Sequence, residues 1–190
     1  MKSEITYFDE GGRNNTEETL RLAKERALER GIRKIVIASI RGKTVPAALE
    51  IFKGSEWKLY FASCDACNDC PRFDPEMKRQ LEAAGHELIF ANENAYPYPQ
   101  EAELAFRRIC EGMKVVVHLS IAVTEEGITP SGEEIVAIAG TGWKGYDKGG
   151  GADTAVIIKT STAEEFWNYQ PLAEHKKSGR KIREIICMPR

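Results

Sequence analysis

Long apolar runs are absent from this 190-residue sequence, and no segment approaches the roughly 20 apolar residues that span a bilayer. The N-terminus, MKSEITYFDEGGRNN, also has no apolar stretch of the kind found in a signal peptide. We therefore expect a cytoplasmic protein with no membrane partner.

An excess of positive charge is absent as well. Lys and Arg total 27 against 29 Asp and Glu, which gives a formal net charge of −2. Proteins that grip a nucleic-acid backbone need a broad basic surface. We expect no nucleic-acid partner.

The cysteines do not have the pattern of a secreted disulfide framework, because their number is five and three of them lie within seven residues. Cys64, Cys67 and Cys70 are spaced like the first three ligands of a bacterial ferredoxin cluster, but Asp74 stands where the fourth would be. A zinc site would need His86, Cys110 or a partner chain as fourth ligand. Three readings stay open, namely a metal site, dithiol redox chemistry and reduced structural thiols, and we favour the last.

A hydrophobic content of 42% over 190 residues is enough for one substantial core, so we expect one domain over residues 1–190. The first long pattern is a helix that begins after Asn15, which is expected to cap it, and ends at Gly31. A short apolar run at 34–39 follows, as expected for a central strand covered on both faces.

The alternation of helices and strands continues along the chain. We expect helices at 44–52, 75–84 and 100–111 and strands at 57–62, 86–91 and 114–123, with His118 a core residue of the last strand. Strands at 135–139 and 154–159 flank a glycine-rich stretch with no helical pattern and are expected to form an antiparallel pair at the sheet margin, and 181–187 a final strand. This pattern predicts an α/β fold, a three-layer α/β/α sandwich around a mostly parallel sheet.

A turn with the sequence SIRGKT, residues 39–44, lies between a buried strand and a helix. Free backbone amides, the hydroxyls of Ser39 and Thr44 and a cation from Arg41 or Lys43 would together suit a phosphate. The turn lacks the two glycines of a Walker loop, so triphosphate hydrolysis has no support. The alternative is an ordinary strand-to-helix turn in which Gly42 serves geometry and Thr44 caps the helix.

A second candidate is the glycine-rich stretch at 139–154, which has six glycines within twelve positions. Glycines let a backbone approach a ligand closely, and Trp143 and Tyr146 could stack on a planar ring while Lys144 and Lys148 meet an anion. The alternative is a hairpin tip without a ligand. Gly11 and Gly12 are interpreted as a turn.

Topology predicts that these segments meet. A helix that precedes a parallel strand runs opposite to it, so Asn15 and Thr16 should lie at the edge where the strand before Ser39 ends. Ligands of open α/β sheets bind outside the carboxyl ends of the strands. We therefore expect one crevice that collects both candidates.

Two resemblances support this interpretation. Residues 18–44, with their helix, buried strand and Gly42-Lys43-Thr44, resemble the C-terminal domain of pyruvate kinase, where a Ser/Thr-rich turn receives a phosphate of a sugar bisphosphate. Residues 12–20 (GRNNTEETL), 151–155 (GADTA) and 184–189 (EIICMP) resemble a family of small archaeal and bacterial pyruvate kinase α/β-domain proteins. That family implies a three-layer sandwich, a crevice at the strand ends and bound flavin mononucleotide (FMN). The pyruvate kinase barrel is absent, so pyruvate kinase activity is not expected.

We conclude that the chain binds a phosphorylated small molecule, FMN first, as a flavin-dependent oxidoreductase or carrier. The alternative is a non-catalytic sensor of a phosphorylated metabolite. The sequence names no catalytic residue, and a homo-oligomer is compatible with it. The residues expected to bind the ligand are Asn15, Thr16, Ser39, Arg41, Gly42, Lys43, Thr44, Gly140, Thr141, Gly142, Trp143, Gly151, Asp153 and Thr154.

Overall fold

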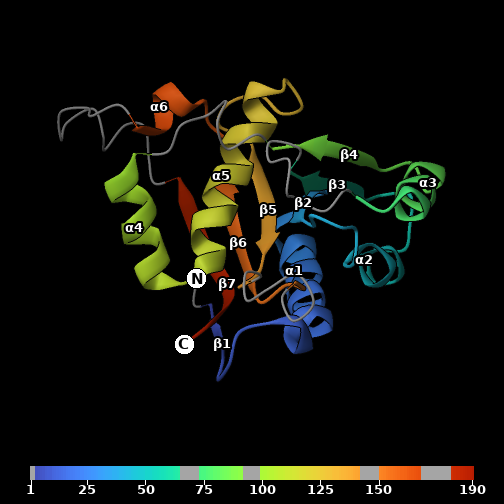
Figure 1. Cartoon of the computed structure of the whole chain (residues 1–190), viewed down its shortest axis with the longest axis horizontal. Coiled ribbons are helices and arrows are strands. Elements are labelled where there is room, and N and C mark those ends of the chain that lie inside the picture. Colours follow the sequence, from blue (N-terminus) through green and yellow to red (C-terminus); the bar gives the residue numbers. More distant parts are fainter. Residues whose placement is uncertain (1–2, 65–72, 92–98, 142–149, 168–180) are drawn as a thin grey trace.

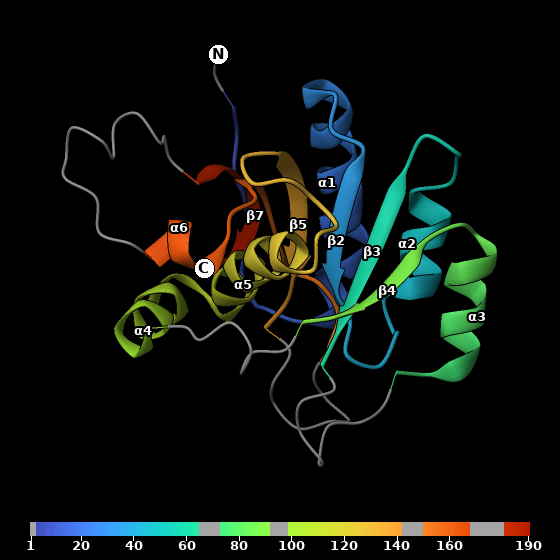
Figure 2. The ribbon, with the colours of Figure 1, turned by 90° about the horizontal axis from the view of Figure 1, so that it is seen from above.

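A seven-stranded sheet forms the middle layer of the protein, as Figures 1 and 2 show. The computed structural model describes residues 3–64, 73–91, 99–141, 150–167 and 181–190. The strands lie in the order β1-β7-β6-β5-β2-β3-β4, and β6 runs antiparallel to both of its neighbours while all other adjacent pairs are parallel. Their bounds are β1 Thr6–Phe8, β2 Lys34–Ala38, β3 Lys58–Ser63, β4 Glu87–Phe90, β5 Glu134–Ala139, β6 Thr154–Lys159 and β7 Ile182–Pro189.

Helices cover both faces of this sheet (Figure 2). On one face lie α1 (Thr16–Arg30), α2 (Val45–Ile51) and α3 (Pro75–Ala83), and on the other lie α4 (Gln100–Ile109), α5 (Glu111–Glu125) and α6 (Ala163–Trp167). The alternating side chains of β2 enter both cores, because Ile35 and Ile37 pack with Leu20 of α1 whereas Val36 packs with Val116 of α5. The predicted three-layer α/β fold is confirmed.

Helix α1 ends as its sequence predicts and begins differently. Gly31 adopts a left-handed φ of 67° and donates to the carbonyl of Leu28 at 3.1 Å, as a glycine C-cap does. Asn15, however, does not cap the helix; its side-chain amide donates to the carbonyl of Glu10 at 2.7 Å. A short 3-10 turn, Arg13–Asn15, directly precedes the helix, so the chain enters α1 through this turn and not through a capping side chain.

The segment at 114–123, predicted as a buried strand, is instead the middle of α5. Eleven of the 15 residues of α5 are buried, because the helix lies between the sheet and the neighbouring helices α4 and α6. A helix enclosed in this way is apolar all round, which is the pattern that a doubly covered strand also shows. His118 is accordingly a buried residue of a helix. The predicted helix at 100–111 ends at Ile109, since Cys110 has an extended backbone that separates α4 from α5.

The margins of the sheet also differ from expectation. The antiparallel pairing of β5 with β6 is confirmed, with Glu134 opposite Lys159 and Ala139 opposite Thr154. The pair does not lie at the margin, however, because β7 and then β1 continue the sheet beyond β6. β1 and α6 are short elements that the sequence pattern did not indicate. No helix in the described ranges has the length and apolar character needed to cross a bilayer.

Candidate functional site

The connections of the sheet diverge between β2 and β5. From β2 the chain passes through α2 to β3 on one side, whereas the strand that follows β5 in the sequence, β6, lies on the other side. The two strands are parallel and adjacent, with Ile37 opposite Ile138, so Ser39 and Gly140 leave the sheet side by side. Such a switch point at the carboxyl ends of parallel strands is where open α/β sheets place their ligands.

The turn at 39–44, on the β2 side, is held by its own hydrogen bonds and by two from neighbouring segments, in which the Ser63 hydroxyl donates to the Ile40 carbonyl at 2.8 Å and the Asp74 amide to the Arg41 carbonyl at 3.3 Å. The Thr44 hydroxyl donates to the Ser39 hydroxyl at 2.5 Å, and the Gly42 amide donates to the Ser39 carbonyl at 3.3 Å. The Val45 amide donates to the Gly42 carbonyl at 2.9 Å, and Pro46 has no amide proton to offer. Much of the predicted donor set therefore stabilises the turn itself.

Gly42 is required by packing as well as by its backbone. Its φ is +82°, and a Cβ atom there would lie 2.9 Å from Cβ of Met77 and 3.0 Å from the ring of Phe73. The residue therefore faces α3 and the segment before it. Lys43, next along the turn, is exposed on the β2 side of the switch point.

Asp153 is the polar centre of the other side of the edge, and it is completely buried. Its Oδ2 accepts from the amides of Gly12 at 2.8 Å and of Thr141 at 2.9 Å, and its Oδ1 accepts from the Thr154 hydroxyl at 2.8 Å. A carboxylate with this many donors can tie segments together, because each bond satisfies a backbone or hydroxyl group that would otherwise be buried without a partner. Asp153 thus joins the segment before α1, the end of β5 and the start of β6.

The backbones around Asp153 approach one another so closely that side chains would not fit. A Cβ atom on Gly140 would lie 2.3 Å from the carbonyl oxygen of Gly151, and one on Gly151 would lie 2.5 Å from Oγ1 of Thr16. Thr16 Oγ1 accepts from the Ala152 amide at 3.0 Å, so the first residue of α1 is hydrogen-bonded to the segment that leads into β6. Gly140 and Gly151, two of the glycines predicted for close approach to a ligand, therefore allow a close approach of the chain to itself.

Helix α5 reaches the same edge from the opposite face of the sheet. A Cβ atom on Gly112 would lie 2.3 Å from Oγ1 of Thr154, and Sγ of Cys110 lies 3.5 Å from that oxygen. Burial raises the pKa of the Cys110 thiol, and burial likewise raises the pKa of Cys187, which lies opposite Ala155 of β6, to about 12. Both cysteines are therefore neutral thiols at physiological pH rather than nucleophiles.

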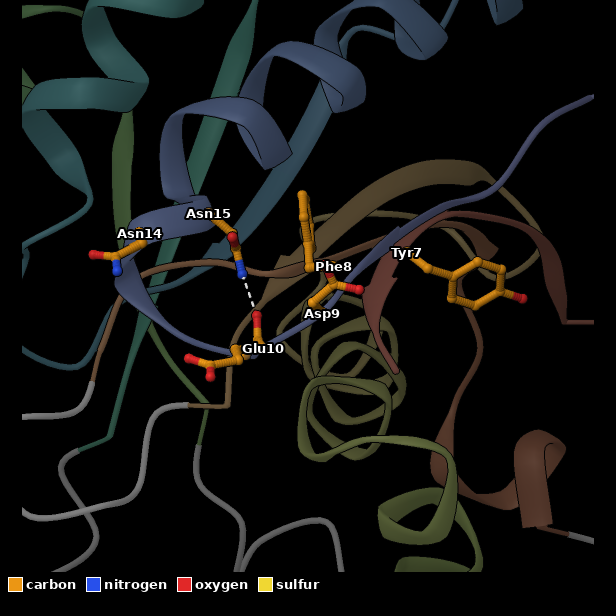
Figure 3. A pocket seen from close by; sticks show the side chains of 7 residues that line it. Tyr7, Phe8, Asp9, Glu10, Asn14 and Asn15 are labelled. Carbon is orange, nitrogen blue, oxygen red and sulfur yellow. Dashed lines mark hydrogen bonds between the residues drawn. The ribbon is translucent and has the colours of Figure 1, made fainter.

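A hollow of about 380 Å³ opens beside this junction, as Figure 3 shows. It is lined by Tyr7, Phe8, Asp9, Glu10, Gly11, Asn14 and Asn15. The side chain of Tyr7 points away from Glu10 and Asn15 in this view, and the carboxylates of Asp9 and Glu10 are exposed. The charge of Asp9 is paired with Arg190 at 3.3 Å, so the lining carries the negative charge of Glu10, which disfavours an anion.

The predicted site residues fall into three groups. Thr16, Gly140, Thr141, Gly151, Asp153 and Thr154 form one cluster with Asn15 beside it, and Ser39, Arg41, Gly42, Lys43 and Thr44 form the turn on the adjacent strand. Gly142 and Trp143 lie outside the described residues, as do Tyr146, Lys144 and Lys148.

Sequence reasoning did not assign Gly11, Gly12, Cys110 or Gly112 to this region. A Cβ atom on Gly11 would lie 2.6 Å from Oγ1 of Thr141. The pair of adjacent glycines, 11 and 12, could have indicated that this segment packs closely at the site, but the sequence analysis interpreted the pair only as a turn.

Of the clustered cysteines, Cys64 is half-buried just after β3, while Cys67 and Cys70 lie outside the described residues. Asp74, at the position of a fourth cluster ligand, caps α3 by accepting from the amides of Glu76 and Met77. His86 directly precedes β4, at the amino ends of the strands and so at the opposite end from Cys64, and its Nδ1 accepts from the Leu59 amide at 3.4 Å. The described ranges contain no group of three side chains suited to hold a metal.

Comparison with known proteins adds an architectural similarity. No protein-family profile matches the chain. Among solved structures, Cryptosporidium parvum pyruvate kinase in complex with ADP is similar at a TM-score of 0.41 and 16% sequence identity, over 77% of this chain and 24% of that one. This chain thus spans about a quarter of the length of that protein. At this identity and TM-score the match carries no argument about activity or ligand, and membership of the pyruvate kinase α/β-domain family stays a prediction.

Proposed function

We propose that the chain binds a small phosphorylated molecule at the carboxyl edge of the sheet between β2 and β5, with FMN as the first ligand to test. The observation that carries the proposal is the switch point, because it brings the end of β2 and the end of β5 together where the connecting chain diverges. The proposal that a ligand binds at this edge therefore does not depend on which ligand it is.

Two groups at this edge can contact a phosphate. The ammonium group of Lys43 is exposed on the β2 side and supplies a positive charge. On the β5 side, Oγ1 of Thr141 is buried and has no hydrogen-bond partner within the described ranges. Because this oxygen is buried against Gly11, it could donate to a phosphate oxygen only if the chain around Gly11 moved.

The acidic hollow favours one orientation of the ligand. The carboxylates of Asp9 and Glu10 lie on the β1 side of the cluster, and those of Glu17 and Glu18 occupy the first turn of α1. Asp9 is paired with Arg190 at 3.3 Å, and Glu17 and Glu18 are each 3.8 Å from Arg21, so Glu10 is the one of the four with no ion pair among the described residues. Glu17 and Glu18 also complement the dipole of α1. The phosphate therefore belongs on the Lys43 side, and an uncharged ring system belongs toward β6.

In the proposal the phosphate end of FMN meets Lys43. The ring end would meet Trp143 and Tyr146 in the sequence prediction, and these residues lie outside the described ranges. When bound, FMN supplies reversible transfer of a hydride or of single electrons. The chain's own part in the proposal is to hold the phosphate and to exclude water from the edge.

The test is a titration of the purified protein with FMN and with riboflavin, followed by flavin fluorescence and calorimetry. Lys43→Ala should weaken FMN binding about tenfold, because a charge-assisted contact is lost. The affinity for riboflavin should stay the same, since it has no phosphate. Lys53→Ala removes the same charge just beyond the other end of α2 and should leave both affinities unchanged.

Equal losses for FMN and riboflavin in Lys43→Ala would remove the phosphate from the 39–44 turn. Failure of FMN, riboflavin and a sugar bisphosphate to bind at millimolar concentration would contradict the proposed function. Mass spectrometry of small molecules that copurify with the protein provides an independent identification of the ligand.

The second candidate function, a non-catalytic sensor of a phosphorylated metabolite, is favoured by the bonding of Asp153. Both oxygens of this buried carboxylate already accept hydrogen bonds from the protein, so it is positioned to hold the fold together and not to take a proton from a substrate. Binding of a sugar bisphosphate without FMN binding would support the sensor.

A further inference from the structure

Helix α4 presents a self-complementary face to the surface. Its inner side carries the half-buried Ala102, Glu103 and Phe106, and none of its ten residues is buried. Of the elements that contact it, α5 is the main one. Seven residues span almost two helical turns, so Glu101 and Arg108 lie on one line along the opposite, exposed side.

The centre of that exposed line is apolar. Leu104 lies between the two charges and is 53% exposed, and its neighbour Ala105 is also exposed. A single exposed leucine is common on protein surfaces and indicates nothing alone. Here it is bracketed by a negative charge one turn before it and a positive charge one turn after it.

These two charges have no partner among the described residues. The neighbouring charges on α4 and α5 are paired, since Arg107 contacts both Glu103 and Glu111. No hydrogen bond or ion pair within the described ranges involves Glu101 or Arg108. The inner charges therefore stabilise the helix pair, whereas the outer two are available to another molecule.

We propose that this face binds a second copy of the chain, with the two α4 helices packed antiparallel about a two-fold axis at Leu104 and Ala105. In that arrangement Glu101 of each copy meets Arg108 of the other, and Leu104 packs against its equivalent. An isologous interface requires a patch that is complementary to itself, and reversal of the helix direction exchanges the positions of the two charges. A partner whose charges are all of one sign could pair with only one of these two residues.

The size of the face predicts a weak dimer. A ten-residue helix is about 15 Å long, and a stable interface usually buries about 800 Å² on each partner, which is more than one such helix provides. We expect dissociation constants on the order of tens of micromolar. Sedimentation velocity or light scattering should therefore show a rise in mass between about 1 µM and about 500 µM.

Charge reversal tests the arrangement. Glu101→Arg and Arg108→Glu each place two like-charged pairs across the axis, so each variant alone should weaken self-association at least tenfold. An equimolar mixture of these two variants restores both opposite-charge pairs and should associate as the native chain does. The double variant Glu101→Arg/Arg108→Glu should do the same. Glu and Arg have similar helix propensities, and circular dichroism checks that each variant is folded.

Matched controls lie on α3, where Glu76 and Arg79 are exposed and pair with each other. Glu76→Arg and Arg79→Glu change the net charge by the same amounts and should leave self-association unchanged. A native chain that stays monomeric to about 500 µM overturns the proposal. Association that survives both single reversals on α4, or a mixture that fails to restore it, places the interface elsewhere and equally overturns it.

Discussion

Two segments at the carboxyl edge of the sheet are held in place in opposite ways. The 39–44 turn is stabilised by bonds between residues that are five apart, such as that from Thr44 to Ser39. The start of β6 is stabilised by bonds across 141 and 136 residues, from Gly12 to Asp153 and from Ala152 to Thr16. The first segment also accepts from the Ser63 hydroxyl and the Asp74 amide, but these partners lie on the next strand of the chain and at the start of α3, whereas the second segment depends on partners from the opposite end of the sequence.

This difference determines what each segment contributes. Lys43 is exposed and takes part in none of the turn's hydrogen bonds among the described residues, so it is available for another purpose without cost to the fold. The Asp153 cluster, by contrast, uses its polar groups to join three distant parts of the chain, and loss of one group leaves others buried without partners. We therefore expect substitutions near β6 to affect stability and the exposed part of the turn to affect binding.

The largest effect that this comparison predicts is that of Asp153→Ala. It leaves the amides of Gly12 and Thr141 without their acceptor, which should lower the free energy of unfolding by about 3 to 5 kcal/mol. Asp153→Asn keeps one carbonyl oxygen for these amides and should lower it by about 1 kcal/mol. Urea unfolding measures both, and Asp9→Ala, an exposed carboxylate, is the control. A loss below about 1 kcal/mol for Asp153→Ala would show that the junction is not held by this side chain.

An intermediate effect is expected from Gly42→Ala, which tests whether the local turn also depends on tertiary packing. The new Cβ meets Met77 and Phe73 at about 3 Å and occupies a backbone with φ +82°. The free energy of unfolding should fall by about 2 to 3 kcal/mol.

Gly85→Ala is the matched control for this prediction, because Gly85 has φ +80° and nothing within 4 Å of its Cβ position. It should lower the free energy of unfolding by about 1 kcal/mol, which is the backbone contribution alone. Equal losses for the two variants would mean that the contact with α3 is unimportant and that the turn is purely local.

The smallest effect concerns Cys187 of β7, which lies opposite Ala155 near the start of β6. Burial raises its pKa from an ordinary 9.0 to about 12, so the folded state keeps the proton that the unfolded state releases. Its contribution to stability is present below pH 9 and is lost as the pH rises toward 12, at about 1.4 kcal/mol per pH unit. Cys187→Ala should flatten this alkaline decline, which urea unfolding between pH 8 and about pH 10.5 measures. An identical pH dependence in the variant would mean that the thiol is not shielded in the folded state.

Local patterns in the sequence predicted most elements of the fold. The alternation of apolar runs with capped helical segments located α1, α2, α3 and α4 and most strands, because these elements follow from side-chain periodicity and from glycines such as Gly31. The same method failed at α5, because an element covered on nearly every side loses the polar stripe that distinguishes a helix from a strand. It also could not place β6 inside the sheet, since strand order depends on how β7 and β1 return to it.

For the candidate site, the sequence by itself determined which residue types are present and that those following β2 and β5, together with the start of α1, lie at one edge. This follows because parallel strands and their connecting helices leave few ways to arrange the chain. Only the tertiary structure decided their roles. In the folded protein Gly140 and Gly151 pack closely against other parts of the chain, both oxygens of Asp153 accept hydrogen bonds, and Lys43 is exposed. Hydrogen bonds between residues more than 130 positions apart depend on which surfaces meet after folding, and no local pattern encodes that meeting.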